Sequence, residues 1–288
     1  MKIFLTGATG YIGQVVAEQL QQSGHQVYGL ARSPASAAKL HAMGVEVVAG
    51  DLRDLPVLQA AARQADAVIH TAICWGAEVA QFDEQAVRAM LEAMARSNKP
   101  FLYTSGVWVL GDTKGHVAGE MWKPRPPAIV AWRLAVERLV LTAGERGVRG
   151  MVIRPAMVYG RGGGFVAGLV QQAKQKGCVE IAGTGENHMS FVPVEGLAKL
   201  YVLAVESPLS GELFLAADGP AFTVRSLAEA TGARVETVPL ELARQKFGPV
   251  ADALVMDQRV MSTKAGRLLG WNPRYPSVLE EVKRMMAE

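Results

Sequence analysis

The stretch "IFLTGATGYIG", residues 3–13, decides the fold of this chain. Its first residues are apolar or β-branched, which indicates a buried strand, and its glycines stand where a helix opens. Gly7, Gly10 and Gly13 give the spacing G-x-x-G-x-x-G. A pyrophosphate group needs a backbone that it can approach closely and a helix N-terminus whose amide groups and dipole face the anion. The stretch therefore predicts a strand, a turn and a helix that together bind a dinucleotide.

Beyond this turn, strand-like runs alternate with stretches of helical periodicity. The strand-like runs are residues 2–7, 25–32, 45–51, 66–72, 99–106 and 149–160, and the helical stretches are 11–24, 33–44, 54–65, 79–97 and a helix from about residue 127. Such alternation requires crossovers and a parallel sheet that is covered on both faces. Beyond Gly160 the elements become shorter and the turns richer in glycine. We expect a doubly wound α/β domain over residues 1–160, to which later segments return, and a smaller, mainly substrate-binding region over 161–288.

Composition and charge exclude several classes of function. Of the 288 residues, 50% are hydrophobic and 20% are charged, and the net charge of +3 comes from scattered Lys and Arg, which does not indicate nucleic-acid binding. No apolar run approaches membrane-spanning length. Cys74 and Cys178 have no metal-ligand spacing and are expected to be free thiols. We expect a cytoplasmic protein without a metal site, a monomer or homodimer, with a small-molecule substrate.

Thr6 and the glycine spacing after it resemble the short-chain dehydrogenase/reductase superfamily, in its extended or atypical branch, close to the NAD-dependent epimerases and dehydratases. Other segments agree with this family: "GDL" at 50–52, "VIHTA" at 68–72, "IRPAMVYGRGGG" at 153–164, "SFVPVEGLAKLYVLAVES" at 190–207 and "LGWNPR" at 269–274. Gly196 stands where the family commonly has an Asp. The resemblance runs from residue 2 to about residue 275. It implies cofactor contacts from Thr6, Gly7, Thr9, Gly10, Tyr11, Ile12, Gly13, Asp51, Leu52, Thr71 and Ala72.

The residue after the second strand bears on the choice of nicotinamide cofactor. An acid at this place accepts hydrogen bonds from the adenine ribose and selects NAD, whereas an Arg pairs with a 2′-phosphate. The sequence reads "GLARS" at 29–33, with Arg32 and no acid. It therefore favours NADP, with NAD as the alternative cofactor. The other interpretation is that Arg32 is an ordinary solvated arginine at the start of a loop and has no role in cofactor choice.

The stretch "PPAIVAWRLAVERLV", residues 126–140, reads as the start of an amphipathic helix. The resemblance implies a Tyr general acid/base on this helix and a Lys four residues later, but Ile129 and Arg133 stand there. Registering "LYTSGVWVLG" on Gly111 places Gly106 at the position of the family's catalytic Ser, with Ser105 just before it. An Arg can hold the nicotinamide ribose but cannot shuttle protons. The candidate catalytic residues are Ser105, Arg133, Tyr159 and His188.

Ile129 and Arg133 stand where the resemblance implies Tyr and Lys, and we call them the altered pair. Three functional hypotheses follow from this pair. The first is an NADP(H)-dependent oxidoreductase or epimerase-like enzyme that takes its proton from water or another group. The second is a catalytically silent dinucleotide-binding sensor or assembly protein, and the third is an enzyme whose substrate supplies its own acid. Trp75, Trp108 and Trp132 are either walls of a cleft or packed core. The Gly- and Pro-rich residues 111–127 either cover a substrate or form a disordered surface segment.

Overall fold

The computed structural model describes residues 1–74 and 76–288, so the prediction for Trp75 lies outside the described residues. The chain divides into two compact units. Unit 1 comprises residues 1–105, 132–154 and 197–214, and unit 2 comprises 106–131, 155–196 and 215–288. Each unit is therefore assembled from three separate stretches of the chain. The assignment of substrate binding to residues 161–288 stays a prediction.

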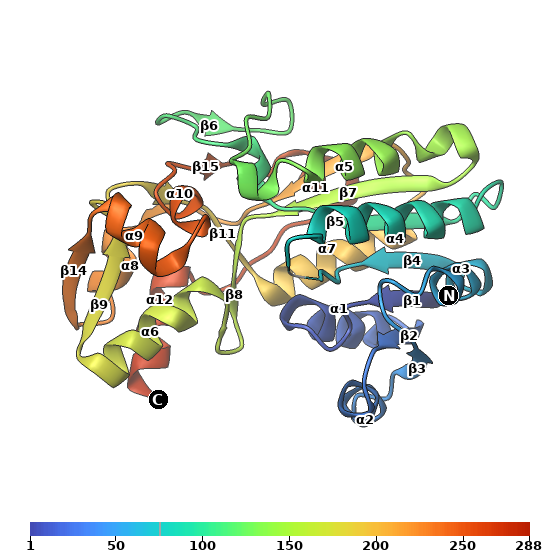
Figure 1. The fold of residues 1–288 in the computed structure, drawn as a ribbon, viewed down its shortest axis with the longest axis horizontal. Coiled ribbons are helices and arrows are strands. Elements are labelled where there is room, and N and C mark those ends of the chain that lie inside the picture. The colour runs from blue at the N-terminus through green and yellow to red at the C-terminus, as the bar shows by residue number, and fades with distance from the viewer. Residues whose placement is uncertain (75) are drawn as a thin grey trace. The chain divides into compact units, whose positions relative to one another are not determined.

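Unit 1 is built on a seven-stranded sheet in the order β12-β7-β5-β4-β1-β2-β3. The strands are β1 (Lys2–Thr6), β2 (Gln26–Ala31), β3 (Glu46–Ala49), β4 (Ala67–His70), β5 (Pro100–Thr104), β7 (Arg149–Pro155) and β12 (Glu212–Ala216). In Figure 1, β3, β2, β1, β4, β5 and β7 follow one another from bottom to top. The pairings from β3 through β7 are all parallel. The chain winds outward from β1 to β3 and then returns to β4, so the predicted doubly wound sheet is confirmed.

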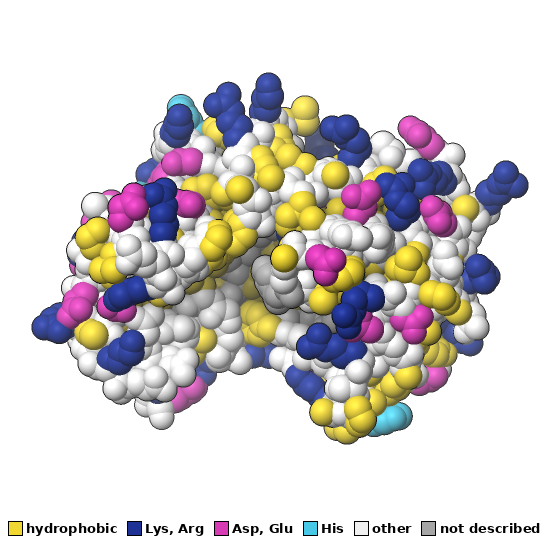
Figure 2. Space-filling view, in the orientation of Figure 1, with side chains coloured by type: hydrophobic (Ala, Val, Ile, Leu, Met, Phe, Trp, Pro, Cys, Tyr) yellow, Lys and Arg dark blue, Asp and Glu magenta, His cyan; other side chains and the backbone are white. Residues whose placement is uncertain are grey.

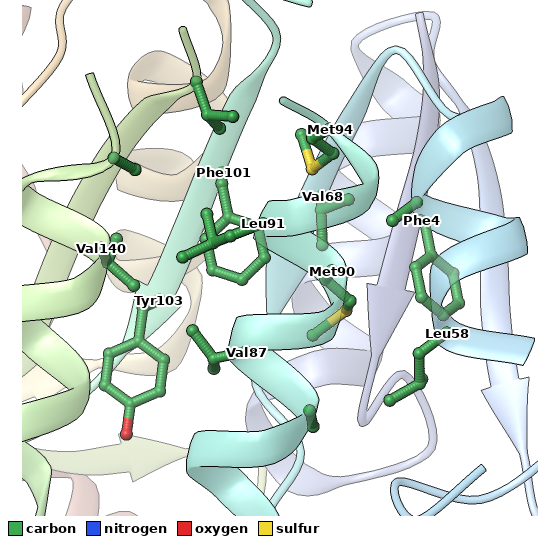
Figure 3. Packing of buried hydrophobic residues seen from close by; sticks show 14 of the residues in the cluster. Phe4, Leu58, Val68, Val87, Met90, Leu91, Met94, Phe101, Tyr103 and Val140 are labelled. Carbon is green, nitrogen blue, oxygen red and sulfur yellow. The ribbon is translucent and has the colours of Figure 1, made fainter. Parts of the chain in front are cut away.

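Helices cover both faces of this sheet. They are α1 (Tyr11–Gln22), α2 (Pro34–Ala42), α3 (Leu55–Gln64), α4 (Val79–Ala93), α5 (Arg133–Leu141), the short turn η3 (Ala143–Arg146) and α7 (Val194–Glu206). Figure 3 shows Phe4, Val68, Phe101 and Tyr103 of the sheet packed against Leu58 of α3, against Val87, Met90 and Leu91 of α4, and against Met94, which follows α4. Because side chains alternate along a strand, Ile3 and Leu5 face the opposite side, and both are buried. This two-sided burial is what the apolar runs predicted.

Local signals explain where two of these helices begin. Ser33 caps α2 through a capping box with Ser36, and Asp54 caps α3 by accepting a hydrogen bond from the Val57 amide. The prediction that a helix starts at about residue 127 is wrong. Pro127 is extended, residues 128–130 form the 3-10 turn η2 (Ala128–Val130), and α5 begins only at Arg133.

Unit 2 consists of paired short strands with helices. The strand pairs are β8 (Met157–Gly160) with β11 (Phe191–Pro193), β9 (Cys178–Ala182) with β14 (Arg234–Val238), β10 (His188–Met189) with β13 (Phe222–Thr223) and β6 (Val117–Ala118) with β15 (Arg259–Val260). The helices are α6 (Gly164–Lys176), α8 (Val224–Glu229), α9 (Leu240–Phe247), α10 (Val250–Leu254), α11 (Lys264–Leu269) and α12 (Val278–Ala287), with the 3-10 turn η1 (Val107–Leu110). The run 149–160, expected as one strand, is two strands, because Ala156 pairs with Ala216 whereas Met157 pairs with Ser190.

The Gly- and Pro-rich residues 111–127 are tied into unit 2. The Thr113 amide donates to the Asp257 carbonyl at 2.7 Å, and β6 pairs in parallel with β15. The segment is therefore ordered. Neither in residues 1–74 nor in residues 76–288 is any helix long and apolar enough to cross a lipid bilayer.

Candidate functional site

A pocket of about 550 Å³ opens in unit 1 beside the glycine turn after β1. Its walls come from the segments that follow β1, β2, β3 and β4, at the carboxyl ends of the strands where the sheet order reverses. The predicted cofactor residues that line it are Gly7, Thr9, Gly10, Tyr11, Ile12, Gly13, Arg32, Asp51, Leu52, Thr71 and Ala72. The lining residues that sequence reasoning missed are Leu30, Ser36, Gly50, Ile73 and Cys74. The structure thus brings most of the predicted cofactor residues together.

The three glycines of the turn differ in what they permit. Gly7 has a φ of +76°, and a Cβ there would lie 2.7 Å from the Ala72 amide nitrogen. A Cβ at Gly13 would lie 2.1 Å from the Gly7 carbonyl oxygen, so Gly13 lets α1 pack directly on the turn. Gly10, the N-cap of α1, has ordinary extended dihedrals, and its Cβ would lie 3.1 Å from the same oxygen. Gly7 and Gly13 are therefore needed for packing, whereas the absence of a side chain at Gly10 leaves the space before α1 open.

The start of α1 fits a pyrophosphate. Gly10 supplies no capping side chain, and the first turn, residues 11–14, reads YIGQ and carries no acid. The amide groups of the first helical turn and the positive dipole end of the helix can therefore meet an anion at the pocket. A dinucleotide would find its phosphate cradle here.

Basic side chains gather near the end of β2. Arg32 is exposed and lines the pocket, and Lys39 of α2 donates from its ammonium to the Thr9 carbonyl oxygen at 2.7 Å. Asp51 lies on the other wall, where Arg53 Nε donates to its carboxylate at 2.7 Å. This hydrogen bond lowers the pKa of Asp51 from its ordinary value. The acid is thus paired, whereas Arg32 directs its charge toward the pocket. The helical periodicity of the residues after Arg32 could have indicated that Lys39 lies on the helix that follows Arg32.

Thr6, predicted as a cofactor contact, lies beneath the pocket instead of lining it. Its side chain is fully buried, and its hydroxyl lies 2.7 Å from Nδ1 of His70, the β4 residue that pairs with it in register. His70 Nε2 lies 3.2 Å from the Asp83 carboxylate on α4. Thr6 therefore supports the strand that carries the turn.

The same buried chain of polar groups continues to Arg133. Tyr103 donates its hydroxyl to Asp83 at 2.7 Å, and Arg133 Nη1 donates to the Tyr103 hydroxyl at 3.2 Å and to the Thr104 carbonyl at 2.9 Å. The guanidinium also lies 4.7 Å from the ring centroid of Trp132. Burial, followed by the charge of Asp83, raises the pKa of Tyr103 well above its ordinary value. Arg133 is thus a positive charge fixed at the carboxyl end of β5.

Ser105 lies next to this anchor. It follows Thr104 directly, its amide donates to the Ile153 carbonyl at 2.8 Å, and its residue is 8% exposed. Its buried hydroxyl has no hydrogen-bond partner among the described residues. A buried polar group without a partner is costly, which makes the hydroxyl suited to a ligand oxygen. Ser105 and Arg133 are the two catalytic candidates that the structure brings together.

The other two catalytic candidates belong to unit 2. The Tyr159 hydroxyl donates to the Pro276 carbonyl at 2.7 Å, and burial raises the pKa of this phenol far above its ordinary value. Both observations disfavour Tyr159 as an acid or base. His188 Nδ1 lies 2.8 Å from the Asp257 carboxylate. Ile129 and Gly106 also lie in unit 2.

A model of the NAD dependent epimerase/dehydratase family matches residues 3–216. The chain belongs to this family. An uncharacterized protein of Saccharomyces cerevisiae is 32% identical over 98% of each chain. The 2-alkyl-3-oxoalkanoate reductase of Stenotrophomonas maltophilia is 25% identical, with 79% of this chain and 73% of that protein covered. The solved UDP-glucuronic acid 4-epimerase from Bacillus cereus, in complex with UDP-glucuronic acid and NAD, has a TM-score of 0.80 at 20% identity, covering 100% of this chain and 98% of the other. That likeness shows the fold.

Membership in the epimerase/dehydratase family makes the chain an oxidoreductase- or epimerase-type protein. The matched residues include the whole dinucleotide pocket and the end of β5. At the two positions where the resemblance implies Tyr and Lys, the sequence has Ile129 and Arg133.

Proposed function

We propose that the chain is an NADP(H)-dependent oxidoreductase that reduces or oxidises a small-molecule carbonyl or alcohol without a phenolate base. One observation carries the proposal: the glycine-cradled pocket of unit 1 has Arg32 on its wall and no acid at the end of β2. A guanidinium there can form charge-assisted hydrogen bonds with a 2′-phosphate.

Each part of unit 1 has a role in holding this cofactor. The α1 amides after Gly10 would hold the pyrophosphate, and Arg32 would bind the adenosine 2′-phosphate, aided by the nearby charge of Lys39. Arg133, held by Tyr103 and the end of β5, would donate to the nicotinamide ribose. The bound nicotinamide supplies or accepts the hydride.

The residues at the end of β5 can bind and orient a substrate oxygen. The unpartnered Ser105 hydroxyl would donate to that oxygen, and the fixed charge of Arg133 would stabilise electron density that builds up near it. Neither group supplies a base, because an Arg cannot shuttle protons and the chain has Ile129 in place of a Tyr. The proton would then be exchanged with water or with a group of the substrate itself.

Cofactor choice is tested by titrating NADPH and NADH into wild type, Arg32→Ala and Arg88→Ala, the last a partly exposed arginine on α4 paired with Glu84. A charge-assisted phosphate contact contributes about 1.5–3 kcal/mol, so wild type should bind NADPH roughly 10- to 100-fold more tightly than NADH. Arg32→Ala should abolish that preference, and Arg88→Ala should keep it. Equal affinities in wild type would overturn the NADP assignment.

Turnover is tested by following NADPH absorbance with a panel of ketones and aldehydes. Oxidation of NADPH that depends on a carbonyl supports the enzyme proposal. Tight NADPH binding without turnover across the panel favours the silent dinucleotide-binding alternative.

We also propose a reducing cytoplasmic compartment and a small-molecule partner for the chain. The free thiols of Cys74 and Cys178 support the compartment. Figure 2 shows, on the face that it displays, Lys and Arg side chains interspersed with Asp and Glu, which does not favour nucleic acid as the partner.

A further inference from the structure

A second pocket, of about 500 Å³, lies wholly within unit 2, and none of its described lining residues also lines the dinucleotide pocket. Its charged or titratable lining residues are His188 of β10, Asp218 in the loop before β13 and Arg259 of β15. Apolar side chains complete the wall, among them Val117 and Met261, which are 56% and 54% exposed. The pocket combines both signs of charge with an apolar rim.

Asp257 fixes the orientation of His188. Its carboxylate Oδ1 lies 2.8 Å from both the backbone nitrogen and Nδ1 of His188. A carboxylate only accepts, so Nδ1 carries the proton, and the 3.1 Å approach of Arg259 Nη2 to Nδ1 is a contact without a hydrogen bond. Nε2 lies on the opposite side of the ring from Asp257 and, in the neutral ring, is an acceptor. His188 therefore offers the pocket an acceptor.

Asp257 is occupied by its protein partners. Besides His188, the Gly115 amide donates to its carboxylate at 3.0 Å, and Arg259 Nε lies 3.5 Å away. Burial alone would raise the pKa of Asp257, but the hydrogen bonds from His188 and Gly115 outweigh it, and the pKa is lowered. Arg259 Nε is buried and makes no hydrogen bond to any described residue. The pairing of Arg259 with Asp257 is thus incomplete, and its partly exposed guanidinium lines the pocket.

Asp218 is the opposite charge on the same wall. Its amide donates to the Phe191 carbonyl at 2.7 Å, and the pairing of Thr223 with His188 closes the other end of its loop. Burial raises the pKa of Asp218. The charged form is stabilised by a hydrogen bond from the Gly219 amide, and no cation of the described residues forms an ion pair with it. The pocket therefore holds a carboxylate without a counter-ion and, elsewhere on its wall, a guanidinium with spare donors.

We propose that this pocket binds a free α-amino acid with an apolar side chain. The amino-acid carboxylate would accept hydrogen bonds from Arg259, its ammonium would donate to Asp218 and to Nε2 of His188, and its side chain would lie against Val117 and Met261. A simple carboxylate would leave Asp218 without a counter-ion, and a simple amine would leave Arg259 with spare donors. Asp218 and Arg259 carry opposite charges, so they match a ligand that carries both signs. This site goes beyond the proposed function and does not depend on it.

The test is isothermal titration with leucine and with its two half-ligands, isocaproate, which lacks the ammonium, and isoamylamine, which lacks the carboxylate. Wild type is compared with Asp218→Asn, Arg259→Gln and Asp252→Asn, the last a carboxylate on α10 paired with Arg244, outside the pocket lining. Leucine should bind at least roughly 10-fold more tightly than either half-ligand, because each supplies only one charge-assisted contact.

The variants should separate the two contacts. Asp218→Asn should lower leucine affinity to that of isocaproate without weakening isocaproate, and Arg259→Gln should lower it to that of isoamylamine, whereas Asp252→Asn should behave as wild type. Asp218→Asn is nearly isosteric in a partly exposed loop, so it tests the site even if Arg259→Gln does not fold. Half-ligands that match leucine, a neutral effect of Asp218→Asn, or no heat with leucine, methionine and phenylalanine would each overturn the proposal. NADPH titrated separately reports on the proposed function alone.

Discussion

A side chain added at Gly13 should damage a different property of the protein from one added at Gly10. At Gly13 the new Cβ would lie 2.1 Å from the Gly7 carbonyl oxygen and 2.7 Å from its carbon, and these backbone atoms cannot rotate away. At Gly10 the Cβ would lie 3.1 Å from that oxygen in a conformation open to any residue. Gly13→Ala must therefore shift the turn from α1, whereas Gly10→Val chiefly fills the space beside the amide groups of the first turn of α1.

The two substitutions differ in expected magnitude. Overpacking costs about 1–3 kcal/mol, and with about 2–4 °C per kcal/mol for a chain of this size, Gly13→Ala should lower Tm by roughly 2–12 °C. Gly10→Val loses the N-cap preference, about 1 kcal/mol, and adds a tight but smaller contact with the Gly7 carbonyl oxygen. NADPH at 100-fold its Kd adds about 2.7 kcal/mol, or roughly 5–11 °C, and Gly10→Val should lose that gain.

Thermal unfolding with and without NADPH measures both effects on one sample. Gly168→Ala is the matched control, because Gly168 lies inside α6 with open space around its Cβ position, so it should keep the NADPH shift and gain slightly in Tm. The reasoning is refuted if Gly13→Ala unfolds at the wild-type temperature or if Gly10→Val keeps the full NADPH shift.

Three further predictions follow from unit 1 and the altered pair. Glu137→Gln breaks a buried two-point pair with Arg154 and should lower the free energy of unfolding by about 3–5 kcal/mol in urea titrations; a loss below about 1 kcal/mol would contradict the pair's importance. Tyr103→Phe removes the hydroxyl that Arg133 contacts, so it should lower the free energy of unfolding by about 1–3 kcal/mol and weaken NADPH binding, as measured by calorimetry. An unchanged free energy of unfolding and an unchanged NADPH affinity would show that the contact contributes to neither. Ile129→Tyr with Arg133→Lys should add alcohol oxidation that depends on a phenolate base, which wild type lacks, provided that Ser105 is correctly placed; strong phenolate-type activity in wild type, seen as a single base in the pH profile, would contradict our alignment of this helix.

The sequence was informative where the determining contacts are local. The glycine turn, the strands β1 to β5 and the helices α1 to α4 follow from periodicity and caps within short windows. The start of α5 was wrong because the apolar periodicity continues through Ala128–Val130, although Pro127 directs the chain into a 3-10 turn. The split of run 149–160 depends on pairing with residues far along the chain, which periodicity does not report.

The candidate site shows the same division. The pocket after β1 was predictable because one turn supplies six of its lining residues. The meeting of Arg133, itself a sequence candidate, with Tyr103 and Asp83 was not, because the three residues come from three elements and depend on register. One feature of the sequence could have indicated the role of Asp83. It stands at helical spacing from the apolar Val87 and Met90, so it lies on the buried face of α4, where an acid requires a partner.

Arg133 is the first residue of α5, so its charge coincides with the positive end of the helix dipole. The Tyr103 hydroxyl beside it stays neutral, because burial and Asp83 hold the pKa of that phenol well above its ordinary value. Arg133 and Tyr103 themselves therefore keep the same charge across about pH 6–9. A reaction assisted by Arg133 would keep this guanidinium's charge throughout that range, and any pH dependence of its rate would report on the substrate or on other groups, among them His70, which lies 3.2 Å from Asp83 in the same buried chain.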